Sequence, residues 1–200
     1  MTDSNVDLAA LIGSRICHDL ISPIGAITNG LELLEMSQGT TTGPEMALIA
    51  DSCANANARI RFFRVAFGAA GRGQSMSRGE VIKVLDALSK GGRLSYDYGP
   101  TGDMDRAEIQ LAFLGLLCAE TALPRGGKVT VDYSARRWRI VTDGSPLRIE
   151  PEVWVALDDP AARKALAPAQ VQFALLPVLA LTLGRSVSFE QENELLRLTV

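Results

Sequence analysis

The sequence is poor in the residues that build metal sites and disulfide frameworks. Its 200 residues contain one histidine and three cysteines. Cys17, Cys53 and Cys118 are far apart and lie within apolar helical patterns. This arrangement predicts buried thiols in a reducing cytoplasm. One histidine without a CxxC pair offers a transition-metal ion few ligands, so we expect neither a metal nor a cofactor on this chain.

Charge of one sign and long apolar runs are also scarce. A net charge of −3 gives no basic field that would favour nucleic acid. The first seven residues are polar and acidic, unlike a signal peptide. The most apolar run, residues 173–183, is shorter than the roughly 18 residues of a membrane span and contains Pro177. We expect a cytoplasmic protein that has neither a nucleic-acid nor a membrane partner.

The first 70 residues predict two long helices. Apolar residues recur three and four positions apart between residues 6 and 36, and again between Pro44 and about residue 70. The first predicted seam is Ile16, Leu20, Ile24, Ile27, Leu31 and Leu34. The second is Met46, Ile49, Cys53, Ala56, Ile60, Phe63 and Phe67. The small polar segment 37–43 separates the two helices, which predicts an antiparallel hairpin.

A hairpin alone cannot bury all of its apolar residues. The first helix carries four more outside its seam, at Leu11, Ile12, Ile21 and Leu33. A second copy of the hairpin would cover them in a four-helix bundle, so we predict a homodimer. The alternative is that the C-terminal half of the chain covers this face.

The hydrophobic period changes after the hairpin. Residues 71–79 are rich in Gly, Ser and Arg and predict a linker. The order from residue 80 onward is helix, strand, helix, strand, strand, helix, strand, strand. We therefore predict an α+β fold with a helical hairpin at 1–70, a linker at 71–79, and a domain at 80–200 with helices on one face of a mostly antiparallel sheet.

The single histidine, His18, is predicted to face away from the hairpin interior. It lies about 200° and 160° round the helix from the seam residues Ile16 and Leu20. An exposed imidazole is partly neutral near pH 7 and can act as a nucleophile. Asp19 could hold one ring nitrogen as N–H, and Arg15, one turn earlier, could meet a phosphate. On this pattern alone, a plain surface histidine is the alternative.

Residues 15–24, Arg-Ile-Cys-His-Asp-Leu-Ile-Ser-Pro-Ile, resemble the phosphoacceptor H-box of two-component histidine kinases. In that motif, His-Asp/Glu-Leu is followed by two residues and then Pro. The continuation at 25–34, Gly-Ala-Ile-Thr-Asn-Gly-Leu-Glu-Leu-Leu, resembles the ChpT family of histidine phosphotransferases from alphaproteobacteria. The resemblance runs along the whole chain, but only as a pattern in the C-terminal half. It implies a dimeric four-helix bundle followed by a degenerate histidine-kinase ATPase-like sandwich.

The resemblance also implies a function and roles for the H-box residues. His18 would take a phosphoryl group from the receiver aspartate of a hybrid kinase and pass it to response regulators. Asp19 would orient or deprotonate the imidazole. Ser22 would face the phosphoryl group, and the alternative is that its hydroxyl has no role in the transfer. The receivers would supply Mg²⁺. The residues expected to bind the receiver are Arg15, Ile21, Gly25 and Ala26, and the alternative for the last three is packing within the bundle.

Three nucleotide-binding motifs of kinases are missing from the C-terminal half. Cys118 stands where the N-box would place its magnesium-binding Asn. Residues 142–146, Thr-Asp-Gly-Ser-Pro, lack the second glycine of the Asp-x-Gly-x-Gly box, and residues 171–175 contain no glycine-rich lid. We therefore expect no ATP-dependent autophosphorylation. Two alternatives remain: a non-catalytic dimeric scaffold or inhibitor that binds a kinase or receiver, and a degenerate ATP-dependent kinase.

Overall fold

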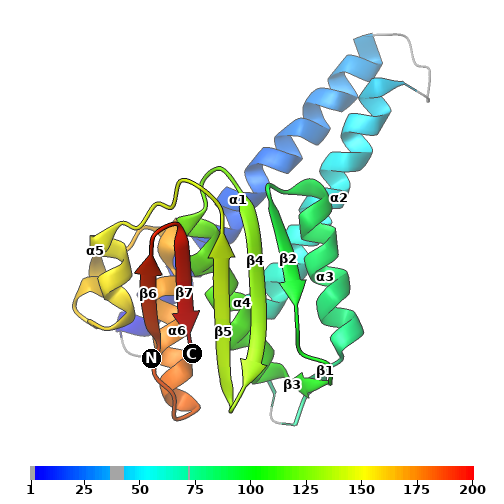
Figure 1. Cartoon of the computed structure of the whole chain (residues 1–200). Helices are drawn as coiled ribbons and strands as arrows, with labels where there is room; N and C mark the ends of the chain where they lie inside the picture. Colours follow the sequence, from blue (N-terminus) through cyan, green and yellow to red (C-terminus); the bar gives the residue numbers. More distant parts are fainter. Residues whose placement is uncertain (1–2, 37–42, 72) are drawn as a thin grey trace.

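The computed structural model describes residues 3–36, 43–71 and 73–200. Helices α1 (Asp3–Met36) and α2 (Pro44–Ala66) form the predicted hairpin. The distal end of the hairpin projects beyond the C-terminal domain, whereas its other end lies behind that domain (Figure 1). Most of the predicted loop at 37–43 falls outside the described residues. Pro44 occupies the first turn of α2, where its missing N–H leaves no helical bond unmade.

Both predicted seams are wrong at particular residues. Ile24, Leu31 and Ile60 are 54%, 50% and 48% exposed. The inner stripe of α1 consists of buried or half-buried residues spaced four and three apart: Ile16, Leu20, Pro23, Ile27, Gly30 and Leu34. Pro23 and Gly30 contribute little to a count of apolar side chains. The pattern therefore selected Ile24 and Leu31, which lie one position further round the helix.

The cysteines differ in their burial. Cys118 is buried, Cys53 is half-buried and Cys17 is exposed. The prediction of a buried thiol was therefore wrong for Cys17. Its neighbour Ile16 packs against the core, so the next residue, about 100° further round the helix, turns outward.

The C-terminal domain is built on a five-stranded sheet of order β2-β4-β5-β7-β6. The pair β2–β4 is parallel and the other neighbours are antiparallel, as predicted for a mostly antiparallel sheet. Buried residues alternate along the central strands, so one face of the sheet is apolar. The strands are β2 (Leu94–Tyr98), β4 (Gly127–Ser134), β5 (Arg137–Asp143), β6 (Ser188–Glu192) and β7 (Leu195–Thr199).

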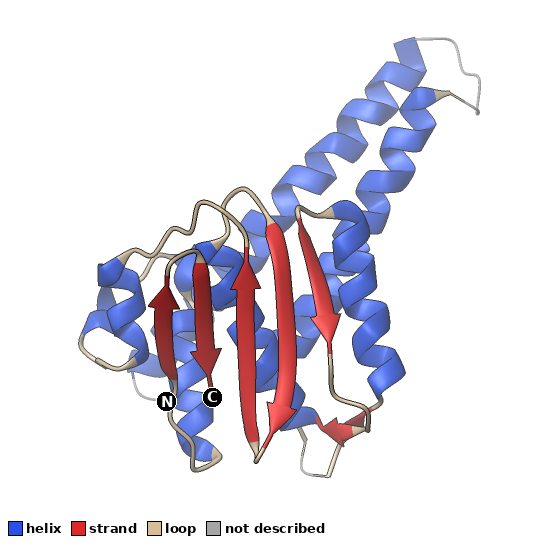
Figure 2. Cartoon of the chain, viewed as in Figure 1, coloured by secondary structure: helices blue, strands red, loops and turns tan. Residues whose placement is uncertain are grey.

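One main helix of this domain lies beside β2, and the other two pack behind the sheet (Figure 2). They are α3 (Arg78–Gly91), α4 (Arg106–Ala122) and α6 (Gln172–Thr182). Helix α4 is almost entirely buried. Its Gly115 lies so near the sheet that a Cβ there would come within 2.3 Å of Ile140 Cδ1. Glycine at this position therefore permits the close helix–sheet contact.

Helix α3 begins with a capping box. Ser77 Oγ accepts the N–H of Glu80 at 3.3 Å, and Glu80 Oε2 accepts the N–H of Ser77 at 2.9 Å. These reciprocal bonds satisfy free donors at the helix start. They place the helix start at Arg78, two residues before the start expected from the sequence.

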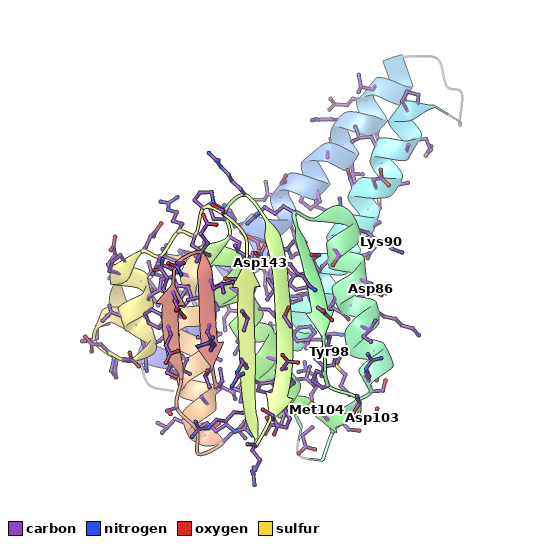
Figure 3. All side chains as sticks on the ribbon, in the orientation of Figure 1. Asp86, Lys90, Tyr98, Asp103, Met104 and Asp143 are labelled. Atoms are coloured by element: carbon purple, nitrogen blue, oxygen red, sulfur yellow. The ribbon has the colours of Figure 1, made fainter. Side chains whose placement is uncertain are left out.

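Short elements complete the domain. They are β1 (Ser75–Met76), β3 (Met104–Asp105), α5 (Pro151–Trp154), η1 (Val155–Leu157), η2 (Ala162–Ala165) and η3 (Pro168–Gln170). Strand β1 falls within the predicted linker and pairs with β3. Beside this pair, the Tyr98 hydroxyl donates to the Met104 sulfur at 3.7 Å (Figure 3). The linker segment that the structure describes is therefore partly folded onto the domain.

Aromatic stacking joins the hairpin to the C-terminal domain. Phe62 of α2 stacks on Phe113 of α4, with ring centroids 4.8 Å apart. Leu8 and Ile16 of α1 also pack against the core. The α+β class and the helical hairpin are confirmed. None of the helices in the described part of the chain combines the length and apolar character that a membrane crossing needs.

Candidate functional site

His18 lies on the outer side of α1, as its position relative to the seam predicted. Its side chain is 75% exposed. The ring atom Nδ1 lies 3.1 Å from Asp19 Oδ1. Because a carboxylate oxygen only accepts hydrogen bonds, this contact requires the hydrogen to be on Nδ1. In the neutral imidazole, the other ring nitrogen, Nε2, then carries the lone pair.

Arg15 holds Asp19 from the side opposite His18. Arg15 Nε donates to Asp19 Oδ2 at 3.1 Å, and Nη2 lies 3.0 Å from the same oxygen. The Arg15 and Asp19 side chains are only 9% and 13% exposed. Arg15 Nη1 also donates to the backbone oxygen of Ala169 in η3. The expectation that Arg15 faces an incoming phosphate is therefore corrected, because its guanidinium is buried between α1 and the C-terminal domain.

The other H-box residues lie at different depths. Ser22 and Gly25 are exposed, Ile21 is 70% exposed, and Ala26 is half-buried. A Cβ added to Gly25 would meet no atom within 4 Å, so the surface there is open. Within a single hairpin, Ile21 is not packed in the interior.

A cleft of 720 Å³ opens between the hairpin and the C-terminal domain. His18 lies at this cleft together with Ser22 and Ala26, whereas Ile21 and Gly25 are not among the lining residues. A Cβ on Gly91 would overlap the side chain of Asn55 across the cleft. The glycine thus lets the two parts approach closely. The wall formed by the C-terminal domain includes Gly91, Gly92, Arg93, Glu120, Thr121 and Glu150.

Sequence reasoning missed a second ion pair, which lines the same cleft. Arg59 of α2 donates Nη1 to Glu120 Oε2 at 3.0 Å and Nη2 to Glu120 Oε1 at 2.8 Å. Arg93 lies further off, with Nη2 at 3.9 Å from Glu120 Oε1. A carboxylate directly after the apolar run 111–119 was the available signal, because buried acids are normally paired.

The protonation of Glu120 depends on these arginines. Burial opposes ionisation of its carboxyl group, but the hydrogen bonds and charge of Arg59, with the charges of Arg15 and Arg93, hold its pKa below the usual value. Burial raises the pKa of the nearby Tyr96 hydroxyl, and the charge of Glu120 raises it further. The cleft therefore contains an ionised carboxylate surrounded by guanidinium groups.

Metal-binding chemistry has little support in the described residues. Among them, no group of three or more His, Cys, Asp or Glu side chains could hold a metal ion. Cys118, at the position that the resemblance gives to a magnesium-binding Asn, is fully buried. Burial also raises the pKa of its thiol, so the sulfur remains protonated.

Known proteins match this chain along its length. The family model for the histidine phosphotransferase C-terminal domain matches residues 78–195. The protein phosphotransferase ChpT of Brucella abortus (strain 2308) is 35% identical, over 97% of this chain and 95% of that protein. A solved structure of a bacterial phosphotransferase aligns with a TM-score of 0.79 at 33% identity, covering 100% of this chain and 98% of that chain. The chain therefore belongs to the histidine phosphotransferase family that includes ChpT.

Proposed function

We propose that this protein is a histidine phosphotransferase of a two-component phosphorelay. His18 receives a phosphoryl group from the receiver aspartate of a hybrid kinase and passes it to the aspartates of response regulators. The observation that carries this proposal is the exposed imidazole whose Nδ1 contacts Asp19 at 3.1 Å. Family membership supports the phosphotransfer chemistry.

The transfer step follows from the state of the ring. The Nε2 lone pair attacks the phosphorus in line, the P–O bond to the receiver aspartate breaks, and that aspartate leaves as a carboxylate. The Nδ1 hydrogen stays in place, so the phosphorylated ring carries a positive charge that the Asp19 carboxylate stabilises. Attack by the aspartate of the next receiver reverses these changes. Mg²⁺ and a lysine of each receiver neutralise charge on the transferring group.

Ser22 and its neighbours form the surrounding surface. Ser22 lies one turn after His18 at the same cleft, where its hydroxyl can donate to a phosphoryl oxygen. The exposed side chain of Ile21 and the open surface over Gly25 suit contact with a receiver helix. Ala26 extends this surface along α1.

ATP is not the phosphoryl donor in this proposal. The buried Cys118 side chain offers no oxygen to the magnesium of a nucleotide. Residues 171–175 lie in the buried start of α6, where a nucleotide-binding protein would place a glycine-rich loop. These two features support transfer only between proteins.

A homodimer through the distal hairpin completes the proposal. Ile24 and Leu31 are exposed, and their spacing of seven residues places them on one face of α1. A second hairpin would bury them in a four-helix bundle. Near the start of α1, Leu8 and Ile16 instead pack against the core that α2 shares with the C-terminal domain. The C-terminal half therefore helps to cover the start of α1, whereas a second hairpin would cover the exposed residues further along the helix.

The proposal is tested by incubating the protein with a receiver domain carrying labelled phosphoryl-aspartate and Mg²⁺. We expect the wild type to acquire label, and His18→Ala to acquire none. Cys17→Ala is the matched control, because it changes an exposed adjacent residue, and it should be labelled like the wild type. A wild type that binds the receiver without taking label would instead support a scaffold. Label from Mg-ATP alone would support a kinase.

A further inference from the structure

We propose that Arg15 is a positioning residue through which the C-terminal domain sets the tautomer of His18. The expected effect on phosphoryl transfer rests on the proposed function, whereas the effect on the tautomer rests only on the contacts. Arg15 bonds to Asp19 and to Ala169, and Asp19 contacts His18. This chain of contacts runs from the C-terminal domain to the ring nitrogen opposite the nucleophilic one.

The guanidinium group of Arg15 divides its donors between two acceptors. Nε and Nη2 face Asp19 Oδ2, whereas Nη1 faces the backbone oxygen of Ala169. Because the guanidinium is a rigid planar fork, fixing Nη1 on the C-terminal domain also fixes the direction of Nε. A lysine carries one nitrogen on a flexible chain and cannot reproduce both contacts in the same geometry.

Asp19 passes this orientation on through its second oxygen. Oδ2 is held by Arg15, which leaves Oδ1 directed at His18 Nδ1. The Arg15–Asp19 pair is almost buried, whereas the imidazole is largely in solvent. An exposed imidazole alone exchanges its hydrogen between both nitrogens. The buried pair supplies a fixed acceptor that favours Nδ1–H and keeps the lone pair on Nε2.

The acceptor side of the link is also anchored. The N–H of Ala167, the residue before η3, donates to Gln170 Oε1 at 3.0 Å. Gln172, just after η3, donates Nε2 to Thr121 Oγ1 of α4 at 3.0 Å. Thr121 follows Glu120, which holds Arg59 of α2. The C-terminal end of α4 is therefore bonded both to α2 and to the segment that contains the Ala169 acceptor.

The single histidine makes the tautomer directly measurable. In protein labelled with ¹⁵N-histidine, the ring nitrogens give signals from one residue, and their shifts distinguish Nδ1–H from Nε2–H. We expect the wild type to be mostly Nδ1–H. Arg15→Met should move the population toward Nε2–H and slow phosphoryl transfer from a receiver by about tenfold or more, because the wrong tautomer removes the attacking lone pair.

Two further variants separate positioning from general packing. Arg106→Met removes another arginine bond between the two parts, from Arg106 Nη2 to the backbone oxygen of Arg64 at 2.7 Å, and should leave the His18 tautomer unchanged. Arg15→Lys keeps charge and most of the bulk, and should show a partial shift toward Nε2–H. Its tautomer remains readable if Arg15→Met does not fold.

The measurement needs no phosphoryl donor, so it is independent of the proposed function. Wild-type tautomer populations in folded Arg15→Met, or in Arg15→Lys where that alone folds, would overturn the positioning role. A shift in Arg106→Met as large as in Arg15→Met would also overturn it, because loosening of the domain contact would then suffice. A wild type that takes no label from a receiver would refute the phosphorelay while leaving the tautomer result standing.

Discussion

The two ends of the helical hairpin differ in what covers them. At the end near the C-terminal domain, each helix directs an arginine into that domain, Arg15 from α1 and Arg59 from α2. At the distal end, Leu31 and Leu48 are exposed. The same apolar periodicity runs through both ends. The pattern therefore defines helices and stripes, while the partner of each stripe depends on tertiary contacts.

The largest effect on stability is expected from removing the Arg59–Glu120 ion pair at the end near the C-terminal domain. Glu120→Ala leaves the Arg59 guanidinium partly buried without its carboxylate, so the free energy of unfolding should fall by about 3–5 kcal/mol. Urea denaturation followed by circular dichroism measures this loss. Glu152→Gln, at an exposed acid on α5, is the control and should change stability little. Equal losses in both variants would contradict the role of the ion pair.

The distal end is tested by a charge on its exposed stripe. Leu31→Glu would place a carboxylate in the proposed bundle and should weaken the dimer by about 3 kcal/mol, roughly a hundredfold in dissociation constant. Light scattering over a dilution series measures the mass. Leu181→Glu makes the same change at an exposed leucine of α6 and should leave the mass unchanged. A monomeric wild type at micromolar concentration would refute the dimer.

The stabilisation that Glu120 provides at the end near the C-terminal domain should also depend on pH. Its pKa is lower in the folded chain than in the unfolded chain, because Arg59 outweighs the effect of burial. The stabilisation is therefore complete above the unfolded carboxyl pKa, and it is lost as the pH falls through the folded value. The stability difference between wild type and Glu120→Gln should shrink on acidification. A difference that does not depend on pH would show that charge is not its source.

The smallest effect is expected at Cys17. Because its side chain is exposed, Cys17→Ala should change the free energy of unfolding by less than about 0.5 kcal/mol. In the native wild type, an alkylating reagent should modify Cys17 well before Cys118, whose thiol is buried and has a raised pKa. Mass spectrometry of digested protein identifies the order. Equal labelling of both thiols would contradict their assigned burial.

The sequence predicted the elements better than their contacts. Period and turn residues located the hairpin, the strands and the outward direction of His18, because these depend on local spacing. The adjacent Asp19 was also recognised as a partner of the imidazole. Pro23 and Gly30 were missed on the inner stripe of α1, since a count of apolar side chains gives little weight to either residue.

The parts of the site that the sequence could not predict are contacts between distant segments. Arg15 was expected to face a phosphate, but it turns toward Ala169, which lies 154 residues away in the sequence. The Arg59–Glu120 pair likewise depends on how α2 lies against α4. Neither direction follows from helical spacing, because long arginine side chains can reach to either side of their own stripe.

The contact between Arg15 and Ala169 restricts sequence change in an unequal way. The donor must be an arginine, whereas the acceptor is a main-chain oxygen that every residue type carries. Position 169 can therefore change its side chain freely, while an insertion or deletion in the segment before α6 would move the oxygen. Covariation between residue types would not reveal this link. Among homologues, its signature would be an invariant arginine together with a constant length of that segment.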